Sequence, residues 1–346
     1  FDSMPDGGVT VSVSAEGSSG AGSEDGSKKP ERLSASAASL TEAQDELQHY
    51  SGGLQLFFGH TAYFLLGADV LNTDTARFFD CIERDTAFRL SIPVFAISSG
   101  SASELILGAG DEERDATKLM HALTQELRLR GDMHVYTAAE IISAMDVNGA
   151  ALICAIKCAP SAEAAEDDTQ MLTVIADGYA IIKDGRLCGY IEPELSPAVW
   201  MLTGDMGISD LTVDGSGGDA VTLQLNRCRS GITPRWDGDA LVGFDVDIEL
   251  SASVNESGRP LPLSDPEQER VLCEALNARV TELVNGVLRT SQELGADFLN
   301  LNYAAELDSP KKYAALGGGF ITLFPKLEIN VSVSSRISHT NNISNG

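Results

Sequence analysis

The sequence predicts an α+β protein of two or three domains, in which helices flank mostly antiparallel or mixed sheets. Its 346 residues are too many for one ordinary hydrophobic core. Segments in which apolar and polar residues alternate, typical of half-buried strands, are interspersed with segments whose apolar residues recur at helical spacing. Two long alternating segments, one long helix and a last alternating segment close the chain as a predicted ββαβ unit.

The N-terminal part predicts several elements in alternation. The expected strands are residues 9–15, 54–66 and 91–97, and the expected helices are residues 40–50, 74–84, 101–107 and 112–130. Residues 17–39 are rich in Gly, Ser, Ala and Lys and predict a solvated loop. Ser39 or Thr41 is the expected N-cap of the first helix. The run 54–66 is almost continuously apolar, which predicts a strand buried on both faces.

The middle of the chain contains a clear hairpin signal. Residues 179–182 and 187–191 are apolar runs that flank Asp184-Gly185, a dipeptide that favours a type I′ turn. A short helical segment begins at Pro193. Before the hairpin we expect a helix that opens with a Thr137/Glu140 capping box and stops at Asn148-Gly149. A strand over residues 150–158 and an acidic loop over 161–170 are expected to follow that helix.

The C-terminal part predicts the ββαβ unit. Residues 220–228 and 240–254 alternate as an antiparallel ribbon, joined by a loop that contains Pro234, Trp236 and Gly238. The longest helix, residues 264–294, is expected to open with a capping box of Ser264 and Glu267 and to end before Gly295. The last strand is residues 327–337.

Composition excludes some classes of function. The formal net charge of −27 repels phosphate backbones and anionic lipid headgroups, so we expect no nucleic-acid binding. No apolar run is long enough to span a membrane, and the chain opens at Phe1 without a signal-peptide pattern. We therefore expect a mature soluble body from which any targeting segment has been removed. The six cysteines fit neither a zinc template nor a dense disulfide framework and predict mostly buried free thiols.

Three carboxylates are the first candidate for chemistry. Asp245, Asp247 and Glu249 lie on one face of a predicted strand because side chains alternate with period two. A cation site is conceivable there. The intervening apolar residues, however, are what a half-exposed strand needs, so the solvated face is the favoured interpretation.

Other candidates are weaker still. Cys154 and Cys158 lack further metal ligands nearby, and no histidines are paired at ligand spacing. Residues 317–319 are three glycines without a following Lys-Ser/Thr, and we expect a flexible connection rather than a phosphate cradle or a helix start. Asn330 begins a glycosylation sequon on a predicted strand. We therefore predict no catalytic, cofactor-binding or metal site, no cofactor, and no enzymatic activity.

The stretch 176–200 contains the Asp-Gly hairpin and then Trp200, a pattern that can be compared with known signatures. It resembles "G-x-A-v-F-k-d-g-k-l-v-G-y-l … e … W-l", the signature of the Ger(x)C family, the C subunits of spore germinant receptors. Similarity continues on both sides in one order. The further matching segments are 56–60, 64–67, 78–90, 295–299 and 324–333. The chain departs from the pattern at Tyr313, where the family usually has Trp, and it lacks the N-terminal lipobox cysteine.

The resemblance implies three α/β domains and a non-enzymatic role. With soft boundaries near residues 134 and 210, the domains would be 1–134, 135–210 with the hairpin 179–191, and 211–346 with the long helix 265–294. It also implies a palmitate-type lipoprotein on the outer surface of the spore inner membrane. The lipid anchor would precede this chain, and protein–protein interactions with a soluble-headed A subunit and a transporter-like B subunit would form the nutrient receptor.

Two alternatives to this function stay open at the level of the sequence. The chain could be an extracytoplasmic small-ligand-binding module that senses the germinant in a pocket between domains, with Trp200, Trp236 or Tyr190 in the lining. It could also be an unrecognised hydrolase or metal enzyme built on the carboxylate strand.

Overall fold

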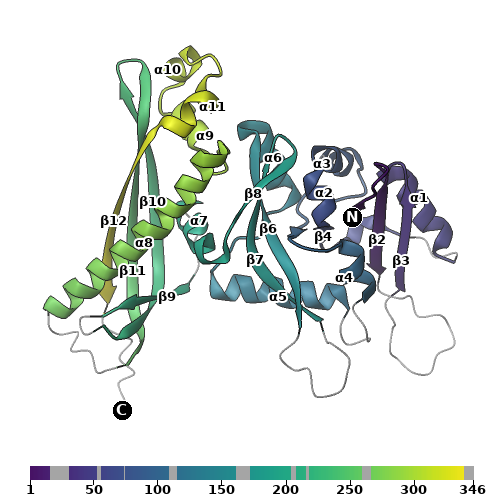
Figure 1. The fold of residues 1–346 in the computed structure, drawn as a ribbon, viewed down its shortest axis with the longest axis horizontal. Coiled ribbons are helices and arrows are strands. Elements are labelled where there is room, and N and C mark those ends of the chain that lie inside the picture. Colours follow the sequence, from purple (N-terminus) through teal and green to yellow (C-terminus); the bar gives the residue numbers. More distant parts are fainter. Residues whose placement is uncertain are drawn as a thin grey trace. The chain divides into compact units, whose positions relative to one another are not determined.

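The computed structural model describes residues 1–15, 31–52, 56–73, 75–108, 115–160, 172–203, 208–215, 218–258 and 266–338. The chain forms two compact units: unit 1 contains residues 1–125 and 135–190, and unit 2 contains residues 126–134 and 191–346. The described strands form three sheets flanked by helices (Figure 1). The predicted α+β class is confirmed. The division into three domains near residues 134 and 210 stays a prediction.

The first sheet of unit 1 contains β1 (Asp2–Ser3), β2 (Val9–Ala15) and β3 (Glu31–Ala37) in that order. Helix α1 (Leu40–Tyr50) packs beside it with Ala43 and Leu47 fully buried, and Ser39 Oγ caps it by accepting from Glu42 N at 3.2 Å. β2, α1 and its cap follow the prediction. The loop predicted over 17–39 is wrong for β3, because its alternating small apolar residues face the core and the surrounding Gly and Ser obscured that pattern.

The second sheet of unit 1 has the order β4-β5-β6-β7-β8. β4 (Phe64–Leu66), β5 (Val94–Ile97) and β6 (Ala150–Pro160) are parallel, and β7 (Leu172–Lys183) is antiparallel to β6 and precedes β8 (Arg186–Ile191). The helices of this part are α2 (Ala68–Asn72), α3 (Thr75–Arg84), α4 (Ala102–Gly108), α6 (Ala138–Asn148) and α5 (Ala116–Arg130), of which the residues from 126 onward belong to unit 2. Aromatic rings from α3 and β4, with Phe88, form much of the core.

The turn chemistry read from the sequence is confirmed. Asp184 and Gly185 join β7 to β8 with φ values of 50° and 75°, as a type I′ turn requires. The carbonyl of Gly185 accepts from both the amide and the hydroxyl of Thr75, each at 2.7 Å, so the hairpin tip is tied to the start of α3. Thr137 and Glu140 form the capping box of α6, and Gly149 ends it in the left-handed conformation.

The predicted strand over 54–66 is wrong for most of its length. Only β4 is a strand, and residues 58–60 form a 3₁₀ helix, η1 (Phe58–His60). Phe57 is 67% exposed, so the run is not buried on both faces. Gly59 and Thr61 interrupt the apolar run, and the Thr61 amide donates to the carbonyl of Phe58 within the same segment.

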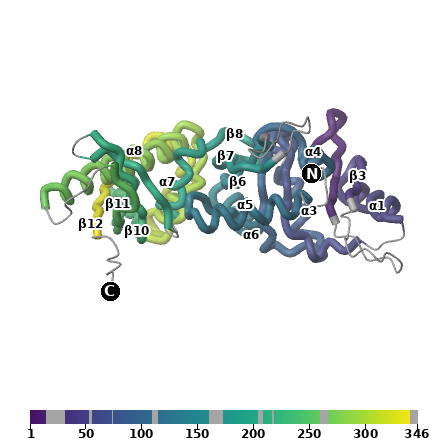
Figure 2. Tube along the Cα trace, turned by 90° about the horizontal axis from the view of Figure 1, so that it is seen from below, coloured from purple at the N-terminus to yellow at the C-terminus, as the bar shows by residue number. Residues whose placement is uncertain are grey.

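Unit 2 is built on one sheet with the order β12-β11-β10-β9 (Figure 2). β9 (Ser209–Asp214), β10 (Ala220–Asp237) and β11 (Ala240–Ser257) are antiparallel, and β12 (Glu328–Ser338) returns parallel to β11. Helix α8 (Pro266–Leu294) supplies the crossover, which confirms the ββαβ unit. η3 (Pro193–Leu195) and α7 (Ser196–Thr203) pack against α8. The absence of a side chain at Gly286 of α8 leaves space for Leu195.

Two details of unit 2 differ from prediction. Pro234 and Trp236 lie inside β10 rather than in a loop. β10 continues beyond the segment in which apolar and polar residues alternate, and the chain turns only at Gly238. The connection from α8 to β12 is helical: α9 (Leu301–Asp308), α10 (Pro310–Ala315), α11 (Phe320–Leu323) and η4 (Phe324–Lys326). A helix therefore does open after residues 317–319, where Gly319 is the N-cap of α11.

Some predictions fall on residues outside those described. They are the loop residues 17–30, the strand start 54–55, Asp74, the helix start 112–114, the loop 161–170 and the cap Ser264. In the part of the chain that the structure covers, no helix is both long and apolar enough to cross a membrane.

Candidate functional site

The three carboxylates on β11 lie on its exposed side. Asp245 lies 3.0 Å from Arg235 Nε, and Glu249 is in register with Arg229 on β10. The intervening apolar side chains of β11 are buried. Nowhere in the described ranges do three or more His, Cys, Asp or Glu side chains gather closely enough to hold a metal ion. The three carboxylates therefore form a solvated strand face, on which Asp245 is ion-paired with Arg235.

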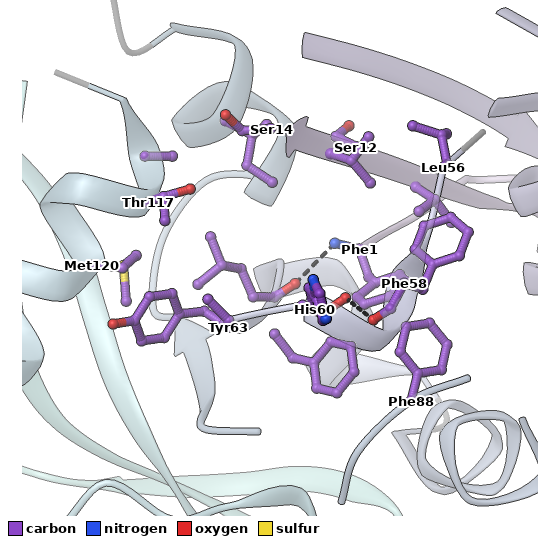
Figure 3. A pocket seen from close by; sticks show the side chains of 18 of the residues that line it. Phe1, Ser12, Ser14, Leu56, Phe58, His60, Tyr63, Phe88, Thr117 and Met120 are labelled. Atoms are coloured by element: carbon purple, nitrogen blue, oxygen red, sulfur yellow. Dashed lines mark hydrogen bonds between the residues drawn. The ribbon is translucent and has the colours of Figure 1, made fainter. Parts of the chain in front are cut away.

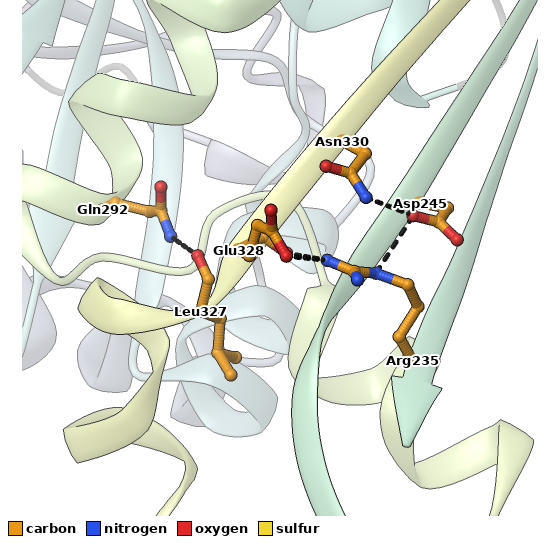
Figure 4. A network of polar contacts seen from close by, with 6 residues as sticks. All are labelled: Arg235, Asp245, Gln292, Leu327, Glu328 and Asn330. Atoms are coloured by element: carbon orange, nitrogen blue, oxygen red, sulfur yellow. Dashed lines mark hydrogen bonds and ion pairs between the residues drawn. The ribbon is translucent and has the colours of Figure 1, made fainter. Parts of the chain in front are cut away.

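A polar network joins this face to β12 and α8 (Figure 4). Arg235 Nη2 also lies 2.8 Å from Glu328 Oε2, and Asn330 Nδ2 donates to Asp245 Oδ1 at 2.9 Å. On the helix side, Gln292 Nε2 donates to the carbonyl of Leu327 at 2.8 Å. The network fixes β12 against its neighbours. Asn330, the start of the sequon, is exposed, but its amide is engaged in this network.

The cysteines are free thiols. Cys154 is fully buried whereas Cys158 is exposed, so the two do not form a common site. Burial raises the pKa of Cys154 well above its ordinary value and raises the pKa of Cys228 to about 11. The pKa of Cys158 is also raised, first by burial and then by Glu104. The thiolate form of cysteine is the form that acts as a nucleophile and binds metals. A raised pKa therefore makes these three thiols poor nucleophiles and poor metal ligands.

The three candidate aromatics are in separate places. Trp200 is buried in α7, with its ring 6.3 Å from that of His134. Trp236 donates from Nε1 to Asp308 at 3.0 Å, and Lys312 lies over its ring. Tyr190 packs against the core of unit 1. None of these residues lines the pocket described next.

Unit 1 contains a pocket of about 580 Å³, a volume within the usual range for small-ligand sites (Figure 3). Its wall includes Phe88, whose ring centroid lies 5.7 Å from that of Phe58 and 5.3 Å from that of Phe64. The described residues that line it include no Asp, Glu, Lys or Arg. Such a wall suits a neutral, mainly apolar or aromatic molecule.

This pocket was not predicted from the sequence, because residues 54–66 were expected to form one strand. The available signal was the Gly59-His60-Thr61 sequence, since glycine inside an apolar run often marks a break in a strand. The break exposes His60 and turns Tyr63 toward the side of the pocket near Met120 (Figure 3).

Unit 2 exposes large apolar side chains on the short helices between α8 and β12. Tyr303 and Leu307 are four residues apart on α9, which places them on one helix face, and they are 47% and 62% exposed. Ile321 on α11 is 62% exposed. Helices α9, α10 and α11 gather at one end of the sheet of unit 2 (Figure 1). Exposed apolar groups gathered in this way are typical of interaction surfaces.

Comparisons with known proteins identify two family matches. The family described as "Spore germination B3/ GerAC like, C-terminal" matches residues 177–341, and the family described as "Spore germination protein N-terminal domain" matches residues 1–157. The search of curated proteins returned no match. A solved structure described as "Crystal Structure of the GerBC protein" is similar over 97% of this chain and 95% of that chain, with 13% sequence identity and a TM-score of 0.64. At that identity the likeness supports the fold alone.

Proposed function

The chain belongs to the GerAC-like family of spore germination proteins, the Ger(x)C family that its motifs resemble, and on that premise we propose that it is a non-enzymatic lipoprotein subunit of a spore nutrient receptor. In this proposal it assembles with an A subunit and a B subunit to trigger germination. The observation that carries the proposal is the pair of family matches, which together extend over most of the chain.

The surface chemistry supports a role in binding other proteins. Of the candidate groups for chemistry, Asp245 is ion-paired with Arg235, and burial raises the pKa values of Cys154 and Cys228. The exposed apolar residues of α9 and α11, in contrast, have no structural reason to face water. An interface with a receptor subunit would bury them.

Co-purification from spore membranes tests the assembly. Tagged protein should retain the cognate A and B subunits, and Leu307→Asp with Ile321→Asp should lower their recovery. Tyr50→Asp is the matched control, because Tyr50 is 61% exposed on α1 of unit 1. Failure of the unsubstituted protein to retain either subunit would contradict the proposal. Equal losses for the double variant and the control would reject the α9–α11 surface as the interface.

The proposed location is the outer surface of the spore inner membrane, through a lipid anchor N-terminal to this chain. This location follows from family likeness. Metabolic labelling with a palmitate analogue should label the full-length gene product and place it in the inner-membrane fraction. An unlabelled product in the spore core would contradict the location without affecting the subunit assignment.

Direct sensing of a small germinant is the second candidate, and the pocket of unit 1 is the observation that favours it. Calorimetric titration with nucleosides and with amino acids that carry aromatic side chains should then give saturable heat. Thr117→Trp would fill the pocket and abolish the heat, whereas Lys118→Trp, at the next position of α5, would not. If titration of the unsubstituted protein gives no saturable heat, the sensing role is rejected and the subunit role is the remaining candidate.

A further inference from the structure

Strand β12 presents an unprotected edge. It is eleven residues long and pairs with β11 over its whole length without a register shift, while no described strand pairs along its other side (Figure 2). Proteins usually protect such an edge with Pro, Lys, a bulge or a short strand. β12 has no Pro, Lys or bulge and is eleven residues long, with Glu328 and Arg336 as its charged residues, whereas the opposite edge strand, β9, has only six residues.

The two faces of β12 have different environments. Odd-numbered side chains face α8, as Ser335 shows by donating to the carbonyl of Cys273 at 3.4 Å. Ile329, Val331 and Val333 on this face are only partly buried, although they are apolar. Even-numbered side chains from Glu328 to Arg336 are exposed. An added strand would therefore cover apolar area on one face and meet polar groups on the other.

We propose that β12 pairs antiparallel with β12 of a second copy of this chain, about a two-fold axis at Ser332. Glu328 of each copy then lies opposite Arg336 of the other, and Val331 lies opposite Val333. In this register odd-numbered residues lie opposite odd-numbered residues, and even-numbered residues lie opposite even-numbered ones. The backbone N–H and C=O groups that point away from β11 in one copy therefore face the corresponding groups of the other copy. The odd-numbered side chains of both copies also share one face of the joined sheet, and the even-numbered side chains share the other.

Charge complementarity selects this register. Glu328 and Arg336 are the only charged residues of β12, and a slip of two residues in either direction separates them. Arg336 has no ion-pair partner among the described residues. Glu328 accepts from Arg235 through Oε2, which leaves acceptor capacity on the carboxylate for a second guanidinium. Opposite charges at directly opposed positions of an antiparallel pair are favourable.

Self-association has a cost in this chain. Each copy carries a formal charge of −27, and the mutual repulsion opposes close approach at low ionic strength. We therefore expect a concentration-dependent dimer at physiological ionic strength rather than an obligate one. The inference concerns this strand alone and does not depend on the receptor assignment.

Cysteine cross-linking tests the register. Residues directly opposite in an antiparallel pair have Cα atoms about 4.5–5.5 Å apart, which is within the range of a disulfide. Ser332→Cys should therefore form a disulfide-linked dimer on mild oxidation. Ser334→Cys is the matched control, because its two copies would be about 13 Å apart along the strands. Both variants keep the six native cysteines, so the background is equal. Equal cross-linking of the two variants would overturn the proposal.

Charge reversal tests the pairing independently. In sedimentation over a concentration series, Arg336→Glu should weaken the dimer roughly tenfold, because two attractive pairs become repulsive. Glu328→Arg should weaken it similarly, and the double variant should restore it. Lys311→Glu, an exposed change of the same charge on α10, should have little effect. Circular dichroism checks that each variant is folded. A monomer at all concentrations, or singles that the double does not rescue, would refute the pairing.

Discussion

At the scale of single residues, Gly67 illustrates how a missing side chain makes room for a buried carboxylate. Asp2 is 7% exposed and accepts from the amides of Ala102 and Ser103 at 2.6 and 2.8 Å, at the start of α4. A Cβ on Gly67 would lie 2.1 Å from Asp2 Oδ1. The motif Phe64 to Gly67, on which the family resemblance partly rests, therefore has a structural reason to end in glycine.

We predict that Gly67→Ala lowers the free energy of unfolding by about 1–3 kcal/mol, because Asp2 must move and leave buried amides unpaired. Urea unfolding followed by circular dichroism measures the change. Gly108→Ala is the control, since nothing lies within 4 Å of a Cβ at that position. An unchanged midpoint for Gly67→Ala would show that Asp2 can relocate without cost.

Asp297 gives a pH-dependent prediction. Burial raises its pKa above the usual value of 3.8, and the amides of Asn302 and Leu301, which donate to it, only partly oppose this. The folded state therefore holds its proton longer than the unfolded state, so stability falls as pH rises from 3.8 through the raised folded pKa. The free energy of unfolding, measured relative to Asp297→Asn, should decrease across this window and then stay constant. A relative stability that increases with pH would mean that the amides outweigh burial.

At the scale of elements, the β7–β8 hairpin combines turn chemistry with a tertiary contact. Gly185 has φ 75°, which an L side chain adopts at a cost, so Gly185→Ala should destabilise by about 1 kcal/mol. Asp184→Asn is the matched control because Asn tolerates the φ of 50° at that position. Thermal unfolding of both variants checks the prediction. Equal effects of the two would indicate that the turn conformation does not limit stability.

Elements with their own local signals were predictable from sequence. The alternation of residues 9–15, the Thr137 capping box and the Asp184-Gly185 turn act through neighbours in the chain, and the structure has each of them. Residues 54–66 were mispredicted because an apolar run has no period that distinguishes a strand from the wall of a pocket. The same limit hid the pocket, which needs residues from β2, α5 and the η1 region together.

The helices α9 to α11 were missed for a different reason. They are four to eight residues long, too short for a helical period to stand out. Their usable signals were Pro310 at the first position of α10 and Asp297, whose carboxylate accepts from the first amides of α9. Because these helices were not predicted, the sequence also did not indicate that side chains of α9 and α11 would be exposed on one surface.

At the scale of the whole molecule, charge is the dominant property. A net charge of −27 destabilises the compact state through self-repulsion, and salt screens it. The melting temperature should therefore rise between low and high NaCl, by about 2–4 °C for each kcal/mol gained. Glucose at equal osmolality is the control for solute effects without charge. A melting temperature that is constant or falls with NaCl would show that local ion pairs, such as Arg235 with Asp245, outweigh the repulsion.

The path of the chain also bears on how a cell makes this protein. Residues 126–134 belong to unit 2, where Asp132 accepts from Ser209 at 2.9 Å, yet they are synthesised in the midst of unit 1. A ribosome that has extended the chain to residue 190 has supplied all of unit 1, but this short segment still lacks its later-made partners. No single cut of the polypeptide can separate the two units cleanly. A truncated protein that ends near residue 190 will therefore contain residues 126–134 of unit 2 without the rest of that unit.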